Sequence, residues 1–454
     1  MHPKQWTKVR NCSLMKKGVN CIMFWSKEQE CISRDELKKL QLFRLKETIK
    51  RVYNNVPFYR KRLDSIGLSP ENISSLDDLK EIPFTTKDDI REHYPYGLFA
   101  EPMKKIVRIH ASSGTTGKPT VVGYTKNDLN TWSELVARVI VEAGGNEDDV
   151  AQVAFGYGLF TGAFGLHYGL EKIGAAVVPC SSGNTEKQIM LMKDFGTTLL
   201  VSTPSYALYM SEVAQELNIK RENLKLRLGL FGAEGSTEEM RNELEQRWGI
   251  VATENYGLSE IIGPGVSGEC IYKQGMHIAE DHFIPEIINP DTGEVLNWGE
   301  KGELVITTIT KEGFPLLRYR TKDITWLTDE PCQCGRTLAR MAKVQGRSDD
   351  MLIIKGVNVF PSQIESVLIG LEHIGPHYQI VVRKKGFVDT LEVLVELIDG
   401  SMLEKFSELE KLEHTIRHKL HTILGLDAKV RLVEPKTIER SMGKAKRVID
   451  LRNS

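Results

Sequence analysis

The sequence predicts an α/β fold, arranged as a large N-terminal α/β domain followed by a small α+β C-terminal domain. The first observation is that short apolar runs alternate with helical patterns between about residues 105 and 330, which is typical of strands joined by helices. The second is that a new helix and strand pattern of about 100 residues, the size of a compact domain, follows Asp350. The strands expected in the large domain include 150–155, 198–202, 226–231 and 302–307, and its expected helices include 205–217 and 238–248.

The expected divisions of the chain are a poorly ordered extension at 1–24, the large domain at 25–348 and the small domain at 349–454. Residues 33–66 are expected to be largely helical, with a break at Pro57, because apolar residues recur there at helical spacing. In the small domain we expect helices at 362–371 and 403–424 and strands at 378–384, 390–399 and 428–433. Ser362 and Glu365 form a capping box after Pro361, so the first of these helices is expected to begin there.

Composition and charge fit a cytoplasmic enzyme. The chain has 454 residues, of which 41% are hydrophobic, and a formal net charge of −1, so nothing indicates binding to nucleic acid or to a membrane. No apolar run approaches the roughly 18 residues of a membrane span, and the apolar stretch at 21–25 is shorter than the roughly 7 residues of a signal segment. Seven cysteines at irregular spacing do not make a disulfide framework, which favours a reducing compartment.

The stretch 112–120, Ser-Ser-Gly-Thr-Thr-Gly-Lys-Pro-Thr, has a composition that suits a polyphosphate. Its glycines let backbone N–H groups approach the anion closely, while the hydroxyls and Lys118 add donors and a positive charge. It is not a Walker loop, because only two residues separate its glycines and a proline follows the lysine. Taken alone, the stretch reads equally well as a surface loop.

Five further stretches, each rich in residues that bind a nucleotide or its metal, follow in order at 232–235, 255–260, 318–323, 346–350 and 443–447. Together the six motifs resemble those of the adenylate-forming enzymes. Within that group, the spellings Ser-Ser-Gly-Thr-Thr-Gly-Lys-Pro-Thr, Tyr-Gly-Leu-Ser-Glu and Ile-Lys-Gly-Val-Asn-Val-Phe-Pro look most like the phenylacetate–coenzyme A ligase family. The resemblance runs from about residue 25 to the C-terminus, and six ordered motifs are more specific than any one of them.

The resemblance implies ATP, Mg²⁺ and coenzyme A as cofactors, with Lys118, Glu260 and Lys444 as catalytic residues. Lys118 and the hydroxyls of Thr115 and Thr116 would hold the β- and γ-phosphates. The residues expected to bind the nucleotide or coenzyme A are Ser113, Gly114, Thr115, Thr116, Gly117, Lys118, Gly232, Ala233, Glu234, Gly235, Asn255, Tyr256, Gly257, Ser259, Asp323, Arg347 and Gly356.

Four of these positions have a particular expected role. Ser259 would contact the α-phosphate, and Glu260 would hold Mg²⁺, which prefers carboxylate and phosphate oxygens. Tyr256 would stack on adenine, and Asp323 would accept hydrogen bonds from the ribose hydroxyls. Without the resemblance, Glu260 would read as a helix N-terminal glutamate, Tyr256 as core and Asp323 as a surface charge.

Lys444 is expected to reach the carboxylate of the acid and the α-phosphate. Lys446 is the alternative, and the basic run around both otherwise reads as a solvated face. Asp349 is expected to be the hinge about which the small domain turns as a unit. That turn would exchange Lys444 for a loop in which Gly356 lets the backbone pass close to the pantetheine arm of coenzyme A.

Cys270, His277, Cys332 and Cys334 supply three sulfur ligands and one nitrogen, a set that suits tetrahedral zinc. A Cys-x-Cys pair is weaker evidence than Cys-x2-Cys, and cysteines are often simply buried apolar residues. Two thiols in the polar turn at 330–336 nevertheless favour a structural Zn²⁺ without an open coordination position.

The segment 155–162 interleaves glycines with aromatic residues, at a spacing one residue off the dinucleotide fingerprint. Tyr157 and Phe160 would line the substrate pocket by stacking on an aryl group, or alternatively would pack between helix and sheet.

The expected function is therefore that of an aryl acid–coenzyme A ligase that acts on a phenylacetate-like acid through an acyl-adenylate and releases AMP and pyrophosphate. Two alternatives stay open: AMP transfer to a non-carboxylate acceptor such as a deazaflavin coenzyme, and nucleotide binding without catalysis. A homodimer is the only macromolecular assembly left open.

Overall fold

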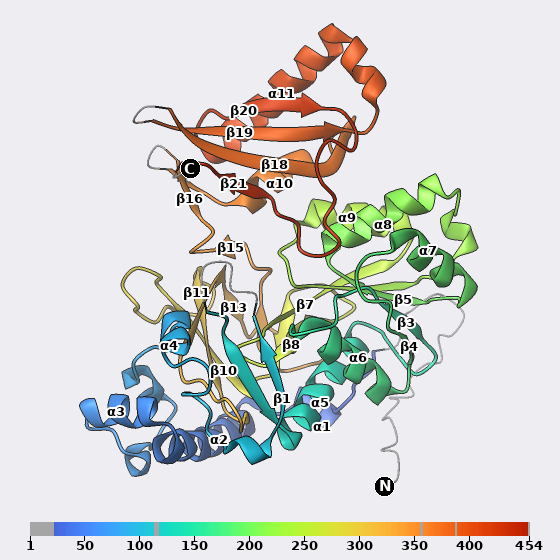
Figure 1. Ribbon diagram of the computed structural model, residues 1–454. Helices are drawn as coiled ribbons and strands as arrows, with labels where there is room; N and C mark the ends of the chain where they lie inside the picture. Colours follow the sequence, from blue (N-terminus) through green and yellow to red (C-terminus); the bar gives the residue numbers. More distant parts are fainter. Residues whose placement is uncertain (1–21, 113–117, 355–356, 386–387, 453–454) are drawn as a thin grey trace.

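The computed structural model describes residues 22–112, 118–354, 357–385 and 388–452. Figure 1 shows the small domain, in orange and red, seated on the large domain. The apolar core of the small domain begins at Leu352, and the main core of the large domain ends at Met341. The expected division between residues 348 and 349 falls between these two cores.

The large domain is built on a nine-stranded sheet in the order β13-β14-β9-β8-β7-β6-β5-β3-β4, in which β7, β6, β5, β3 and β4 run parallel. These strands are β3 (Val150–Val153), β4 (Ala176–Val178), β5 (Leu199–Ser202), β6 (Leu228–Phe231), β7 (Val251–Leu258), β8 (Gly263–Glu269), β9 (Met276–Ile278), β13 (Leu327–Thr328) and β14 (Arg340–Met341). Parallel neighbours require crossover connections, and helices supply them. The helices of this region are α5 (Lys126–Glu142), α6 (Gly162–Ile173), α7 (Thr185–Asp194), α8 (Pro204–Glu216) and α9 (Glu238–Trp248). The alternation expected from the sequence is confirmed.

The start of α8 shows how the sequence fixes an element next to the site. The hydroxyl of Thr203 accepts a hydrogen bond from the backbone N–H of Tyr206, and Pro204 has no N–H to leave unpaired in the first turn. The helix therefore begins directly at the carboxyl end of β5.

A second sheet of four antiparallel strands and a hairpin complete the large domain, with helices at its N-terminal end. The sheet has the order β10-β11-β12-β15, and its strands are β10 (Phe283–Ile288), β11 (Gly302–Thr308), β12 (Tyr319–Thr325) and β15 (Gly346–Arg347). The hairpin and helices are β1 (Ile106–Ala111), β2 (Val121–Thr125), α1 (Lys27–Glu30), α2 (Arg34–Asn55), α3 (Pro57–Ser65) and α4 (Lys87–Glu92). Pro57 separates α2 from α3, as expected. Phe24, placed in the extension by the sequence, is buried with the Arg336 guanidinium 4.6 Å from its ring centre, so the folded chain begins before residue 25.

The small domain packs two helices on a four-stranded sheet in the order β20-β19-β18-β21. Its elements are β16 (Leu352–Ile354), β17 (Val357–Val359), α10 (Pro361–Leu368), β18 (Ile374–Lys385), β19 (Val388–Leu397), α11 (Phe406–Leu424), β20 (Lys429–Val433) and β21 (Val448–Asp450). The sequence did not predict β21, a strand of only three residues.

The predicted capping box of α10 is wrong. The helix begins at Pro361, and the Gln363 side chain accepts a hydrogen bond of 2.9 Å from the N–H of Phe360. Ser362 does not cap the helix because its hydroxyl donates to the carbonyl of Gln345 in the large domain. The helix also ends at Leu368, earlier than expected, since Gly370 adopts a left-handed φ of 86°.

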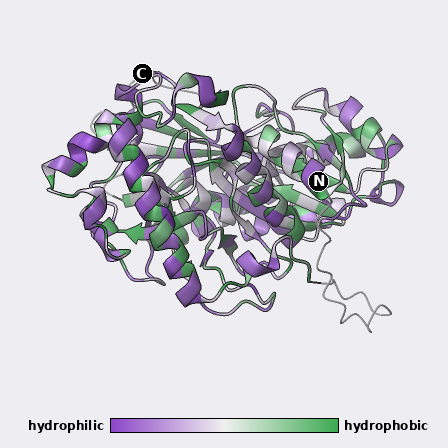
Figure 2. Cartoon of the chain, turned by 90° about the horizontal axis from the view of Figure 1, so that it is seen from below, coloured by the Kyte–Doolittle hydropathy of each residue, from purple (hydrophilic) through white to green (hydrophobic). Residues whose placement is uncertain are grey.

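The two domains share a buried apolar contact. Ile369 of the small domain lies in one cluster with Trp248 and other residues of α7, α8 and α9. In the view of Figure 2, peripheral helices carry many hydrophilic residues, whereas strand segments inside the molecule are more often hydrophobic. Among the described residues, no helix combines the length and apolar character needed to cross a membrane.

Candidate active site

Two motifs of the large domain lie at the carboxyl ends of parallel strands, the edge at which open α/β sheets bind their ligands. Thr203 follows β5, residues 232–235 follow β6, and residues 255–260 form the end of β7 and the turn beyond it. Because β5, β6 and β7 are hydrogen-bonded neighbours, these three segments lie side by side.

Glu260 is a buried carboxylate in this group, with 6% of its surface exposed. One carboxylate oxygen accepts a hydrogen bond of 3.1 Å from Thr120 Oγ1, and Lys87 Nζ lies 3.9 Å from the same oxygen. Thr120 is the last residue of the hydroxyl-rich motif, so the structure brings that motif to Glu260. A carboxylate flanked by a hydroxyl is a suitable set of oxygen donors for Mg²⁺.

Lys311 supports Glu260 from inside the protein. Its Nζ donates to the carbonyl of Ile261 at 2.6 Å and lies 3.4 Å from the carbonyl of Glu260. Burial lowers the pKa of Lys311 to about 7, although the charges of Asp128 and Glu260 oppose that effect. The amine thus fixes the backbone that carries the carboxylate.

Asp323 lies at the centre of a second polar group. Tyr256 donates a hydrogen bond of 2.6 Å to one carboxylate oxygen, and Arg347, directly across the β12–β15 pair, reaches the other at 3.2 Å. Burial raises the pKa of Asp323 to about 6, against the lowering effect of Arg347. Arg347 also donates to both oxygens of Asp349, at 2.8 and 3.0 Å, and so connects the expected ribose ligand to the expected hinge.

Two glycines at the strand ends have physical reasons to be there. A Cβ at Gly257 would lie 1.8 Å from the carbonyl oxygen of Gly263, where β7 and β8 shift register. A Cβ at Gly232 would lie 2.6 Å from the carbonyl oxygen of Asn255, whose side chain donates to the carbonyl of Phe231 at 2.8 Å. These contacts hold the ends of β6 and β7 in a fixed relation.

The loop 441–447 of the small domain, called here the Lys444 loop, docks on the same edge. The carbonyl of Gly443 accepts hydrogen bonds from Thr203 Oγ1 at 3.1 Å and Ser205 Oγ at 3.3 Å. The N–H of Ala445 donates to Glu234 at 3.1 Å, and the other oxygen of Glu234 accepts from the N–H of Ser205 at 2.7 Å. The side chain of Lys444 is exposed, and its charge opposes the rise that burial causes in the pKa of Asp323.

The aromatic segment lies beyond the carboxyl end of β3. Tyr157 is half-buried, its ring meets Phe164 edge to face at 5.3 Å, and its hydroxyl lies 3.0 Å from His167 Nδ1. Phe160 is 49% exposed. The Tyr157 ring is therefore held by packing, whereas Phe160 is open to a partner.

The expected zinc ligands converge. The ligand atoms of Cys270, His277, Cys332 and Cys334 all lie within 4.8 Å of one another and are buried. Cys270 Sγ is 3.7 Å from Cys332 Sγ, close to the sulfur–sulfur edge of about 3.8 Å in a tetrahedron with Zn–S bonds of about 2.3 Å. Cys334 Sγ is 3.3 Å from His277 Nε2, and the other ring nitrogen of His277 faces the Leu338 carbonyl at 3.4 Å, as in a histidine that binds metal through Nε2.

The other predicted site residues lie as follows in the structure. Lys118 is exposed, with its amine 5.5 Å from the centre of the Tyr94 ring, and Ser259 lies 3.0 Å from the hydroxyl of Thr161. Gly235 and Ala233 lie in the turn after β6, and Ala233 takes a φ of 68°. Ser113, Gly114, Thr115, Thr116, Gly117 and Gly356 lie outside the described residues.

Sequence reasoning missed Lys87, Lys311 and the role of Thr120. Thr120 stood in the quoted motif and shared its hydroxyl chemistry. Lys311 carries a signal in retrospect, since it is a single lysine between the buried strand β11 and Phe314. Lys87 follows an ordinary helix cap at Thr86, so its segment offered no sign of a site.

Comparison with known proteins identifies the family of the chain. Residues 68–310 match the family model of AMP-binding enzymes, and residues 356–452 match that of the AMP-binding enzyme C-terminal domain. The phenylacetate–coenzyme A ligase of Escherichia coli (strain K12) is 50% identical over 426 residues, covering 93% of this chain and 97% of that protein. The phenylacetate–coenzyme A ligase of Thermus thermophilus is 48% identical over 444 residues, covering 95% and 100%.

Among solved structures, 2-hydroxyisobutyryl-CoA ligase in the postadenylation state, in complex with 2-HIB-AMP, superposes with a TM-score of 0.89 at 28% identity, covering 94% of this chain and 92% of that one. The same ligase in the thioesterification state gives a TM-score of 0.69, covering 95% and 93%. The fold, the polar groups at the strand ends and these matches define an adenylate-forming enzyme. Within that class, the chain belongs to the phenylacetate–coenzyme A ligase family.

Proposed function

We propose that this chain ligates phenylacetate or a similar arylacetate to coenzyme A in the cytoplasm, using ATP and passing through an acyl-adenylate. The observation that carries the proposal is 50% and 48% identity to two phenylacetate–coenzyme A ligases over almost the whole chain. Both relatives are ligases, which favours this activity over AMP transfer to another acceptor and over nucleotide binding without catalysis.

In the first half-reaction, a carboxylate oxygen of the acid would attack the α-phosphorus of ATP and release pyrophosphate. Glu260 would hold Mg²⁺ against the phosphate oxygens, and Lys118 would neutralise the outer phosphates. Asp323 would fix the ribose. Lys444 would stabilise negative charge on the oxygens around the α-phosphorus as it develops.

In the second half-reaction, the sulfur of coenzyme A would attack the acyl carbonyl carbon, lose its proton to solvent and expel AMP. We propose that the small domain turns about Asp349 between the two steps, bringing the segment around Gly356 to the site in place of Lys444. The comparison structures support two arrangements, since one ligase superposes on this chain at 0.89 in its postadenylation state and at 0.69 in its thioesterification state. This chain's arrangement is accordingly assigned to the adenylation side of the cycle.

The cysteine cluster supports a structural Zn²⁺ with four protein ligands. The sulfur atoms of Cys270 and Cys332 are 3.7 Å apart and not bonded, and this separation fits tetrahedral zinc. No coordination position would remain open, so we assign the metal to folding stability. Free thiols are also what a reducing cytoplasm maintains.

The experiment that tests the function measures coenzyme A-dependent AMP release with phenylacetate, 4-hydroxyphenylacetate, indoleacetate, benzoate, acetate and palmitate. We expect arylacetates to give the highest kcat/KM, because a flat ring gains roughly 1–3 kcal/mol of burial and stacking that acetate lacks. Higher efficiency with acetate or palmitate would contradict the arylacetate assignment and leave the adenylation assignment intact. No AMP release with any acid would contradict the ligase itself.

A further inference from the structure

One helix of the large domain presents a row of polar side chains to the small domain. Ser205, Glu212 and Glu216 of α8 recur at intervals of seven and four residues, and therefore lie on one face. Ser205 holds the carbonyl of Gly443 in the Lys444 loop, and Glu216 pairs with Lys436 at 2.6 Å. The small domain is thus docked along α8 by contacts at both ends of the helix.

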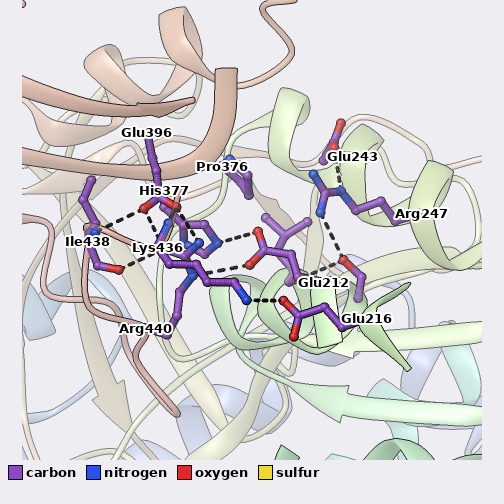
Figure 3. Close-up of polar contacts among 12 residues, drawn as sticks. Glu212, Glu216, Glu243, Arg247, Pro376, His377, Glu396, Lys436, Ile438 and Arg440 are labelled. Atoms are coloured by element: carbon purple, nitrogen blue, oxygen red, sulfur yellow. Dashed lines mark hydrogen bonds and ion pairs between the residues drawn. The ribbon is translucent and has the colours of Figure 1, made fainter. Parts of the chain in front are cut away.

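Glu212 makes the central contact of this row (Figure 3). His377 Nε2 lies 2.7 Å from one of its carboxylate oxygens, and Arg440 Nε lies 3.3 Å from the other. The side chains of Glu212, His377 and Arg440 are only 21%, 10% and 14% exposed, so solvent screens this group much less than a surface pair. Burial alone would raise the pKa of Glu212, but the hydrogen bond and charge of His377, followed by the charge of Arg440, outweigh it and lower the pKa. The carboxylate is ionised at neutral pH.

Contacts within the small domain hold the Arg440 side chain in position for this interaction. Glu396, whose side chain is 2% exposed, accepts two hydrogen bonds of 2.7 Å from the Arg440 guanidinium. It also accepts from the backbone N–H groups of Lys436 and Ile438. The segment 436–440 is therefore ordered by the small domain itself. Arg440 connects it to the large domain through Glu212, and the more exposed Lys436 does so through Glu216.

Lys444 lies four residues beyond Arg440, within the loop that meets Thr203, Ser205 and Glu234 at the other end of α8. We propose that Glu212 is a positioning residue for the adenylation half-reaction, which fixes the Lys444 loop on α8 by holding Arg440 and His377 in this domain arrangement. This proposal rests on the proposed two-step function. It assigns Glu212 no part in thioester formation, because a turn of the small domain would carry both partners away from α8.

The test compares the half-reactions of Glu212→Gln with those of the wild-type protein. The substitution keeps the size of the side chain and removes its charge. We expect adenylate formation, measured as pyrophosphate exchange with phenylacetate, to slow by about ten- to a hundredfold, the range for loss of a hydrogen bond to a charged group. Thioester formation from supplied phenylacetyl-adenylate and coenzyme A should keep at least the wild-type rate, which also shows that the variant is folded. His377→Gln removes one of the two partners and should give a smaller loss in the same half-reaction.

Two matched variants serve as controls. Glu216→Gln removes an interdomain pair whose side chains are 52% and 71% exposed, so solvent already screens it and little should change. Glu243→Gln removes a pair with Arg247, 2.6 Å long, that lies within the large domain in the same view. Neither control should separate the two half-reactions.

Equal loss of both half-reactions in Glu212→Gln, or an unchanged rate of adenylate formation, would overturn the proposal. A second measurement does not depend on turnover, so it tests the role of Glu212 independently of the proposed function. Small-angle X-ray scattering of the wild-type protein should fit the docked arrangement, and Glu212→Gln should shift it toward a more extended one. If wild type adenylates no acid, the proposed function fails, and superimposable scattering curves for the two proteins would then also overturn the role of Glu212.

Discussion

The hydroxyl of Tyr256 donates a 2.6 Å hydrogen bond to the carboxylate of Asp323, and the two residues belong to different sheets of the large domain. Tyr256 lies at the end of β7 in the nine-stranded sheet, whereas Asp323 lies on β12 in the four-stranded sheet. The contact joins both sheets where we place the ribose. Asp323 is buried there, and burial raises the pKa of this group to about 6, although Arg347 and the hydrogen bond from Tyr256 oppose that rise.

The first prediction concerns pH. The ionised Asp323 should accept hydrogen bonds from both ribose hydroxyls, and below its pKa of about 6 the ionised fraction falls about tenfold per pH unit. We therefore expect the Kd of adenosine, which has no phosphate to titrate, to rise by about tenfold between about pH 7.5 and pH 5. Calorimetric titration measures it.

Asp323→Asn should bind adenosine weakly at both pH values, and dideoxyadenosine, which lacks the hydroxyls, should show no pH dependence through this group. A pH-independent Kd for the wild-type protein would contradict the assignment. The effect of Asp323 on stability has the opposite sense. Since its pKa is higher in the folded chain than its ordinary value of 3.8, its contribution to the free energy of unfolding is fully present below pH 3.8 and is lost as pH rises through about 6.

The second prediction concerns Lys444. Lys444→Ala should slow adenylate formation by about 3–4 kcal/mol in activation free energy, because a charge-assisted contact to the transition state is lost. Thioester formation from supplied acyl-adenylate should be spared. Lys446→Ala is the matched control, two residues along the same basic run. A dead Lys446→Ala beside an active Lys444→Ala would move the catalytic assignment to Lys446.

The third prediction concerns Asp349. Asp349→Pro fixes φ at the expected hinge and should slow thioester formation about tenfold or more relative to adenylation. Asp349→Ala removes the contacts with Arg347 but leaves φ free, and so separates loss of charge from loss of rotation. Single-turnover traces decide the matter. Consumption of the adenylate at the wild-type rate in Asp349→Pro would show that the chain turns elsewhere.

The fourth prediction is that the purified protein contains about one zinc per chain, bound by the four-residue cluster. Cys332→Ser should lower the thermal midpoint and leave kcat unchanged, because the metal has no open position. Cys180→Ser, a half-buried cysteine outside the cluster, is the control. Metal-free protein with an unchanged midpoint for Cys332→Ser would identify these cysteines as apolar packing residues.

Sequence patterns predicted the elements of the large domain well because each is specified locally. The strands β5 and β6 are short apolar runs, and α9 has the bounds expected from helical spacing. The start of α10 was not predictable in this way. The sequence predicted a cap at Ser362, but the hydroxyl of Ser362 donates to a carbonyl of the other domain, and no local pattern indicates that contact.

The residues of the candidate site also differ in whether the sequence alone could predict them. Glu260 and Asp323 stand in contiguous motifs and could be named from the sequence. Lys87, by contrast, lies far along the chain from Glu260 and meets it only in the folded protein. The hydrogen bond that the Glu234 side chain accepts was likewise not predictable, since its donor, the N–H of Ala445, belongs to the other domain. Contacts between distant segments leave no local periodicity or spacing.

The Lys444 loop is fastened to the small domain on both sides. Upstream, Glu396 orders residues 436–440, and downstream β21 pairs in parallel with β18 from Val448 onward. Lys444 therefore has little freedom to leave the site alone, and we expect it to leave with the whole domain. In the proposed cycle, withdrawal of the lysine and admission of the thiol are a single event. The reverse reaction, in which pyrophosphate would regenerate ATP, would lose its lysine when coenzyme A gains access, so this rigid attachment would couple the two changes at the site.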